Sequence, residues 1–129
     1  MLALEGNTAP YLLYSYARIR SIFRKGEIDF AGFAPAAVTV DEPAERALAV
    51  HLIQFGQAVA SVDASLEPHR LTNYLYELAG RFHRFFERCP VLKADSDALR
   101  DSRLTLAKLT AEVLGRGLGL LGIQTLERM

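Results

Sequence analysis

The chain has 129 residues, half of them hydrophobic, which is enough for one compact domain with its own core. Its 15 basic and 15 acidic residues balance, which excludes a protein whose whole surface attracts phosphate backbones and confines any nucleic-acid contact to a local patch. The single cysteine, Cys89, excludes a disulfide framework and a multi-cysteine metal site. Without a signal-peptide pattern or a long apolar run, we expect a soluble, cytoplasmic protein with no membrane partner.

The first third of the chain predicts one helix and one loop. Thr8 and Pro10 are typical of a helix start, and apolar residues then recur at helical spacing over about 9–25. Gly26 is expected to end this helix. The segment 30–40 shows neither helical nor strand periodicity, so it is predicted to be a connecting loop.

The rest of the chain predicts further helices. A second helix is expected over about 41–64, a third over about 68–88, and a last helix that begins at Asp95 or Ser96 and weakens after Gly115. There is no convincing strand, and each apolar stripe can be covered only by the other helices. The sequence therefore predicts a single all-α domain over residues 1–129.

Several residues that often carry chemistry are better explained by structure. The glycine spacing of 117–122 matches a dinucleotide-binding turn, but no strand precedes it and only seven residues follow it. His51, His69 and His83 stand too far apart for a helical metal site. Cys89 is more typical of a small buried thiol than of a nucleophile. We therefore predict no catalytic, cofactor-binding or metal-binding residues.

One face of the first helix combines aromatic and basic residues. At 100° per residue this face is set apart from the core stripe. Its residues are Tyr11, Tyr14, Ser15, Arg18, Ile22 and Lys25. Aromatic rings can stack on unpaired bases and cations can contact phosphates, so the face suits single-stranded RNA. An alternative stays open at this point. The tyrosines could be amphipathic packing residues, and the cations could simply form a solvated face of the helix.

A second group of cations follows one side of the third predicted helix. Arg81, Arg84 and Arg88 are spaced at three and seven residues and could extend a phosphate-contacting surface. Pairing of Arg81 with Glu77, four residues earlier, explains that arginine equally well.

The chain resembles a known family along nearly its whole length. The resemblance rests on segments 5–11, 14–18, 102–107 and 120–123 and on the chain end, Leu126 to Met129. The stretches 48–55 and 74–79 and the tetrapeptide Asp97-Ala98-Leu99-Arg100 agree with it. These segments are similar to the C-terminal, DALR-type anticodon-binding domain of bacterial arginyl-tRNA synthetases.

The resemblance implies an anticodon-binding helical bundle of about four to five helices. It also implies a class I parent enzyme that ligates arginine to its tRNA with ATP, whose catalytic domain is missing here. ATP and Mg²⁺ would belong to that missing domain, so this chain alone should be inactive. The implied partners are the anticodon loop of arginine tRNA and the catalytic domain of the same chain, with no DNA, in a monomer. The alternative is a free-standing paralogue that binds other RNA or a protein.

The family's anticodon contacts imply four site residues by position, which are Tyr11, Arg18, Phe86 and Met129. A phenylalanine stands at 86 where relatives often carry tyrosine, so this ring can stack but has no hydroxyl to donate a hydrogen bond. Four further tRNA-binding candidates come from the chemistry of the helix faces rather than from a match in position. These are Tyr14, Arg20, Lys25 and Tyr76.

Overall fold

The computed structural model describes residues 8–65 and 68–125, and over these ranges the chain is helical with no strand. Its helices are α1 (Thr8–Lys25), α2 (Pro43–Ile53), α3 (Phe55–Ser65), α4 (Pro68–Arg88) and α5 (Asp97–Leu120). The prediction of an all-α bundle with four to five helices is confirmed.

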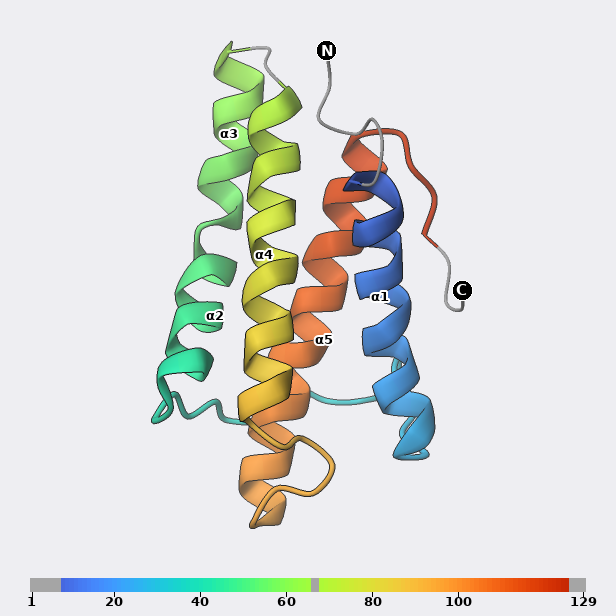
Figure 1. The fold of residues 1–129 in the computed structure, drawn as a ribbon, viewed down its shortest axis with the longest axis vertical. Coiled ribbons are helices and arrows are strands. Elements are labelled where there is room, and N and C mark those ends of the chain that lie inside the picture. Colours follow the sequence, from blue (N-terminus) through green and yellow to red (C-terminus); the bar gives the residue numbers. More distant parts are fainter. Residues whose placement is uncertain (1–7, 66–67, 126–129) are drawn as a thin grey trace.

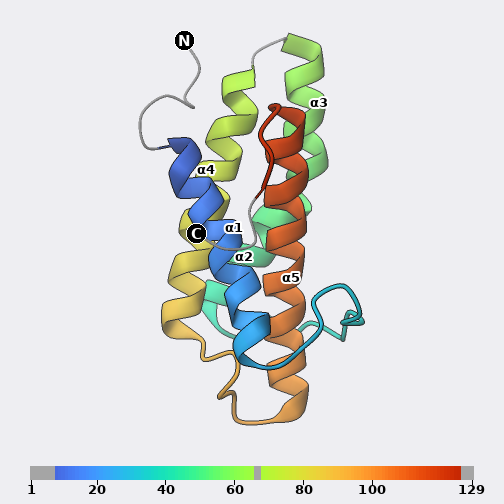
Figure 2. The same cartoon turned by 90° about the vertical axis from the view of Figure 1, so that its right-hand side faces the viewer.

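The bundle is built around α4 and α5, which pack against each other (Figure 1). α1 contacts both of them on one side, while α2 and α3 follow each other along the opposite side of α4 (Figures 1 and 2). α1 and α4 therefore lie side by side on a face that α2 and α3 do not cover. No other described helix packs over the surface that α1 and α4 form together.

The apolar stripe of α4 forms the middle of the core, as its sequence predicts. Leu71, Leu75, Leu78, Phe82 and Phe85 recur at helical spacing and are all fully or almost fully buried. Each such side chain contributes about 1.5–3 kcal/mol by leaving water. The opposite side of the helix is polar, and this contrast fixes which face of α4 points inward.

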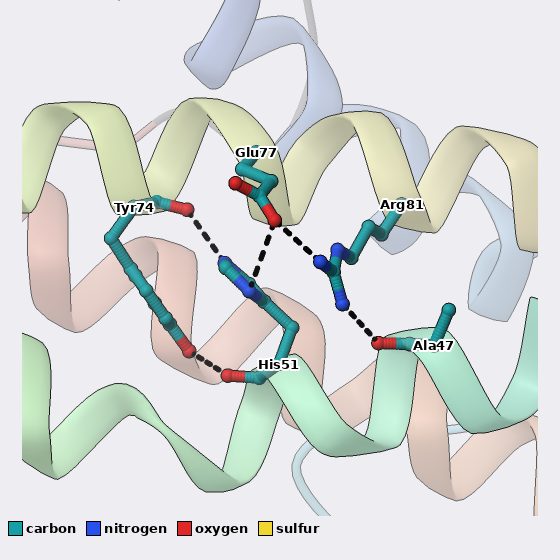
Figure 3. A network of polar contacts seen from close by, with 5 residues as sticks. All are labelled: Ala47, His51, Tyr74, Glu77 and Arg81. Atoms are coloured by element: carbon teal, nitrogen blue, oxygen red, sulfur yellow. Dashed lines mark hydrogen bonds and ion pairs between the residues drawn. The ribbon is translucent and has the colours of Figure 1, made fainter.

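The segment expected to form one helix over 41–64 is instead divided into α2 and α3 at Gln54. An unbroken helix would join the His51 carbonyl to the amide of Phe55. The carbonyl instead accepts the Gln54 amide at 3.1 Å. It also accepts the hydroxyl of Tyr74 from α4 (Figure 3). Our prediction of a continuous helix was wrong because the competing donor is 23 residues away in sequence.

Helices α1 and α5 end in the same hydrogen-bond pattern, with one residue in the left-handed region. After α5 that residue is Gly122, at φ +82°. After α1 it is Glu27, at φ 56°, while the Ile28 amide reaches back to the Phe23 carbonyl at 2.9 Å. Gly26, the predicted stop, has another reason to be glycine: a Cβ there would lie 2.7 Å from a methyl of Leu92.

A buried ion pair joins α2 to α5. Arg103 Nε donates to Glu45 Oε2 at 2.7 Å, and both side chains are almost completely buried. The other carboxylate oxygen accepts the Glu42 amide at the start of α2, and the arginine also donates to the Pro90 carbonyl at 2.8 Å. Both members of the pair are buried and hydrogen-bonded. Removing either Glu45 or Arg103 would therefore leave the other as an uncompensated buried charge. The pair thus fixes the loop after α4 relative to α2.

The loop between α1 and α2 is irregular, as predicted, but it is attached along α5. The Ala36 amide donates to Thr105 Oγ1 and the Thr39 amide to Ser102 Oγ, both at 2.9 Å. Lys108 Nζ donates to the Phe33 carbonyl at 2.9 Å. These contacts come from three successive turns of α5, so the loop follows the helix that it crosses.

The glycine run and the cysteine have structural roles, as we interpreted them. Gly117 lies within α5, where a Cβ would meet the side chain of Leu75 at 2.6 Å. Gly122 supplies the left-handed residue that ends this helix. Cys89 is buried, and burial raises the pKa of its thiol, which keeps it in the unreactive protonated form.

Candidate RNA-binding face

Four aromatic side chains from α1 and α4 meet on the open face of the bundle, and we call them the aromatic cluster: Tyr11, Tyr14, Tyr76 and His83. The ring of Tyr11 lies 5.2 Å from that of Tyr76 and 5.7 Å from His83, and the Tyr14 ring lies 6.4 Å from His83. Tyr14 and Tyr76 are 48 % and 55 % exposed. The cluster therefore offers accessible ring surface whose position is set by two helices.

His83 lies at the centre of the cluster. The Ser15 hydroxyl donates to the Tyr11 carbonyl at 2.9 Å, so its single proton is used. The 3.0 Å contact between Ser15 Oγ and His83 Nε2 must then be donated by the histidine, which leaves the lone pair of the neutral ring on Nδ1. Burial, followed by the nearby charge of Arg18, lowers the pKa of His83, while Glu87 opposes the shift. His83 is therefore uncharged at neutral pH.

Burial also acts on Tyr11, the least exposed tyrosine of the cluster. It raises the pKa of the Tyr11 hydroxyl, Tyr76 adds to this shift, and the charge of Arg84 opposes it. Tyr11 therefore keeps its proton at neutral pH and can donate a hydrogen bond. Arg84 is exposed and supplies positive charge near this end of the cluster.

Arg18 and Phe86 form a second contact, one helical turn beyond Ser15. The guanidinium carbon of Arg18 lies 4.8 Å from the centre of the Phe86 ring, within the range of a cation–π contact. Lys25 lies further along α1 and borders the same hollow as these two residues. The predicted residues Tyr11, Arg18 and Phe86 are thus brought onto one face, together with Tyr14, Tyr76 and Lys25.

Two of the sequence-based candidates, Arg20 and Arg81, lie elsewhere on the bundle. Arg20 is 200° around α1 from Arg18, donates to the Tyr16 hydroxyl at 3.2 Å and lies over the Phe30 ring at 4.0 Å. It packs the loop side of the bundle and does not join the aromatic cluster. Arg81 pairs with Glu77 at 2.6 Å and caps the Ala47 carbonyl, so its structural interpretation is confirmed (Figure 3). Met129 lies outside the described residues.

His83 is the residue that sequence reasoning missed, since we considered it only as a metal ligand and set it aside for its distance from the other histidines. A signal was available: Tyr76 and His83 are seven residues apart on α4, which places them on the same face two turns apart. What the sequence does not contain is the pairing of this face with Tyr11 and Ser15 of α1. That pairing depends on how the two helices pack.

The metal-ligating residue types lie apart from one another in the part of the chain that the structure describes. No group of three or more histidine, cysteine, aspartate or glutamate side chains within 8–65 and 68–125 could hold a metal ion. In the glycine run, which resembled a dinucleotide-binding turn in sequence, Gly117 and Gly119 lie within α5, Gly117 packs against Leu75, and Gly122 follows the helix end. No described helix is long and apolar enough to cross a membrane.

Comparison with known proteins assigns this all-helical domain to a family. Residues 12–129 match the model described as "DALR anticodon binding domain". The chain is 57 % identical to an arginine–tRNA ligase of Thermobifida fusca over 133 residues, and 57 % identical to that of Synechocystis sp. over 129 residues. Each match covers 100 % of this chain and 22 % of the relative, so the chain spans about a fifth of their length.

Solved structures agree with this assignment. The arginyl-tRNA synthetase of Thermus thermophilus superimposes with a TM-score of 0.83 at 37 % identity, and that of Plasmodium falciparum with a TM-score of 0.83 at 31 % identity. Both matches cover 98 % of this chain and 22 % of the other. The chain belongs to the DALR anticodon-binding domain family of arginyl-tRNA synthetases.

Proposed function

We propose that the domain binds the anticodon loop of arginine tRNA and reads the cytosine shared by arginine anticodons at their middle position. In a parent arginine–tRNA ligase, this grip would place the acceptor end of the tRNA at a catalytic domain that uses ATP and Mg²⁺. The domain itself supplies binding and no reaction chemistry. Tyr11, Arg18 and Phe86 carry the contact, with Tyr14, Lys25 and Tyr76 beside them and Met129 as a further candidate.

The observation that carries this proposal is the aromatic cluster beside Arg18. Bases turned out of an RNA loop stack on flat side chains, and each such stack contributes about 1–3 kcal/mol. Tyr14 and Tyr76 are about half exposed, whereas the other tyrosines and phenylalanines are buried in the core or packed against it. The overall charge is zero, so the basic residues along α1 give the RNA a local rather than a general attraction.

The direct test is binding of the chain to an arginine-tRNA anticodon stem-loop, measured by fluorescence anisotropy. We expect binding that weakens when the middle cytosine of the anticodon is replaced by another base. Tyr11→Ala should weaken binding to the original stem-loop by about 1–3 kcal/mol. Equal affinity for the original and the cytosine-substituted stem-loops would contradict the reading of the middle base. Unchanged affinity of Tyr11→Ala would contradict stacking of a base on Tyr11.

Arg18 can act in two ways, and salt separates them. If it contacts a phosphate, Arg18→Ala should lower affinity for all loops and reduce the dependence of log affinity on log salt by about 1. If it contacts a base edge, the variant should lose mainly the preference for cytosine. The matched control is Arg116→Ala, because Arg116 is an exposed cation of α5. Lys108→Ala is unsuitable as a control because Lys108 donates a hydrogen bond to the loop after α1.

A protein-binding role is the second candidate, and one observation favours it. Ile53 is 81 % exposed and Val50 45 % exposed on the outer side of α2, away from α1. Adjacent exposed aliphatic side chains are typical of protein contacts. Ile53→Arg should leave RNA binding unchanged. If this side of α2 docks against the catalytic domain, the same variant should abolish association with a separately produced catalytic domain.

A further inference from the structure

Gly80 lies in the middle of α4, where packing within the described residues gives no reason for a glycine. A glycine inside a helix destabilises it relative to alanine. Gly117 of α5 requires its missing Cβ, because Leu75 occupies that space. At Gly80 a Cβ would meet only Arg84 Nη1, at 3.8 Å, which is an ordinary contact with the end of a flexible side chain. The bundle therefore does not explain this glycine, whereas close approach of a molecule from outside does.

Gly80 belongs to a row of residues along the outer side of α4. Gly80, Arg84 and Arg88 follow one another at four-residue spacing, so they lie one above the other on the helix surface. Both arginines are exposed. We call these three residues the α4 ridge. The ridge begins one turn after Tyr76 of the aromatic cluster, and the charge of Arg84 acts on Tyr11 in that cluster. It therefore continues the face to which we assign RNA binding.

Two carboxylates of α4 lie close to the ridge. Glu77 pairs with Arg81 at 2.6 Å, so its charge is balanced within the fold. Glu87 is exposed and acts on His83 in the aromatic cluster. Because two arginines of the ridge stand against this one carboxylate, the ridge keeps a positive charge. An anionic partner is therefore the one that it suits.

We propose that the α4 ridge binds the phosphate backbone of the double-stranded stem that carries the anticodon loop. Gly80 is the point of closest approach, where a Cβ would meet the backbone. Arg84 and Arg88 each present a planar guanidinium that can donate two parallel hydrogen bonds to one phosphate. The inference rests on the proposed RNA binding and adds a contact that is separate from the reading of bases. Its three residues position the RNA and do not discriminate its sequence.

The chemistry of the ridge favours an RNA stem over an acidic protein segment. Protein contacts depend on buried aromatic or aliphatic anchors. In the described part of the chain, the large exposed apolar side chains lie away from the ridge, and Tyr76, which is closest to it, belongs to the aromatic cluster. Double-stranded RNA is instead recognised through its backbone and shape, for which arginines beside a glycine are sufficient.

Gly80→Ala separates a binding role from a structural one, because stability and binding should change in opposite directions. A methyl group at an open helical position should raise the thermal melting temperature. The same methyl group should weaken binding of the anticodon stem-loop at least threefold, as measured by fluorescence anisotropy. Unchanged binding, or a lower melting temperature that explains weaker binding, would overturn the close approach at Gly80.

Gly119→Ala is the matched control for this substitution. Gly119 also lies within a helix, and a Cβ there would meet no described atom within 4 Å. Because it lies on α5, away from the ridge, the variant should raise the melting temperature and leave RNA binding unchanged. Equal weakening of binding by Gly80→Ala and Gly119→Ala would contradict a specific contact at Gly80.

The arginines are tested by salt and by sequence. Arg84→Ala and Arg88→Ala should each weaken binding at least threefold and reduce the dependence of log affinity on log salt by about 1. The loss should be equal for the original stem-loop and for one whose middle cytosine is replaced. Arg116→Ala, on α5, is the control. Losses equal to that of Arg116→Ala, or losses confined to the original stem-loop, would overturn the backbone contact.

A short RNA duplex with the stem sequence but no loop separates failure of the ridge from failure of the proposed function. In nuclear magnetic resonance of the full chain, the duplex should shift the backbone amides of Gly80, Arg84 and Arg88. If it does so while the original and cytosine-substituted stem-loops bind equally, the ridge stands and the reading of the anticodon falls. If Tyr11→Ala weakens stem-loop binding but the duplex shifts none of the three amides, the proposed function stands and the ridge falls. Shifts caused by a polyglutamate peptide and not by the duplex would likewise overturn the ridge as an RNA contact.

Discussion

Tyr74 and Tyr76 lie two residues apart on α4 and point to opposite sides of it. Tyr74 is 9 % exposed and stacks on His51 of α2, with 4.2 Å between ring centres. Tyr76 is 55 % exposed and lies beside Tyr11, whose other neighbour is His83. Both regions therefore combine tyrosine with histidine, but only one of them is open to solvent.

The difference lies in where the polar atoms are used. On the α2 side, the Tyr74 hydroxyl donates to the His51 carbonyl, and His51 Nε2 contacts the Tyr74 carbonyl at 3.0 Å (Figure 3). Glu77 lies 3.7 Å from His51 Nδ1 and binds Arg81. This network joins two helices and leaves little for a ligand. A tyrosine–histidine pair alone therefore does not mark a binding site; exposed ring surface next to cations does.

Stability should distinguish the two sides most strongly. Tyr74→Ala removes a buried ring and one of the two hydrogen bonds that the His51 carbonyl accepts at the helix break, so we expect a loss of about 3–5 kcal/mol in the free energy of unfolding. Tyr76→Ala is the matched control, and should change this free energy by no more than about 0.5 kcal/mol. Urea denaturation followed by circular dichroism measures both. Similar losses would mean that both rings are structural.

RNA binding should reverse the order. Tyr76→Ala should weaken binding of the anticodon stem-loop by about 1–3 kcal/mol, because an accessible ring is lost from the aromatic cluster. Tyr74→Phe, which keeps the buried ring, should bind as the wild-type chain does. Fluorescence anisotropy at constant salt gives the comparison. Weaker binding by Tyr74→Phe alone would place the RNA on the α2 side.

Alkaline titration gives a smaller difference, which can be followed at Tyr74. Burial, against the opposing charge of Arg81, raises the pKa of this phenol from 10.0 to about 12. Because the folded pKa is higher than the unfolded value, the protonated phenol stabilises the fold, and this contribution declines as pH rises from about 10 to about 12. Difference absorbance of phenolate between the wild-type chain and Tyr74→Phe should show a group that titrates near 12; a group titrating near 10 would contradict the burial.

The smallest effect is expected from His83 on acidification. Its pKa is lowered in the fold, so between that lowered value and the ordinary 6.5 the unfolded chain binds more protons. Stability should be unaffected above pH 7, and should fall as pH decreases through this window. Thermal melting from pH 7 to pH 5 should show a shallower decline for His83→Gln than for the wild-type chain. Identical slopes would mean that another group causes the decline.

The core and the helix bounds could be predicted because they depend on local patterns. The α4 stripe from Leu71 to Phe85 repeats at helical spacing, and Ser96 caps α5 through a 3.1 Å bond from the Leu99 amide, as its position in sequence suggests. The division at Gln54 could not be predicted in this way. It depends on a hydroxyl from another helix, and no local pattern records that donor.

The site was only partly predictable for the same reason. Tyr11 and Arg18 share a face at seven-residue spacing, and this follows from helix geometry alone. The place of His83 in the aromatic cluster depends on how α4 packs against α1. Arg20 shows the opposite error, because its chemistry suits RNA while its direction on α1, toward Phe30, does not.

The hydrogen bonds that hold the loop between α1 and α2 along α5 restrict insertions and deletions in this loop. The amides of Ala36 and Thr39 are three residues apart, and so are the hydroxyls of Thr105 and Ser102 that receive them, in the reverse order. An inserted or deleted residue between 36 and 39 would put these donors and acceptors out of register. Length changes in related genes should therefore avoid this short stretch, even though it contains no helix or strand.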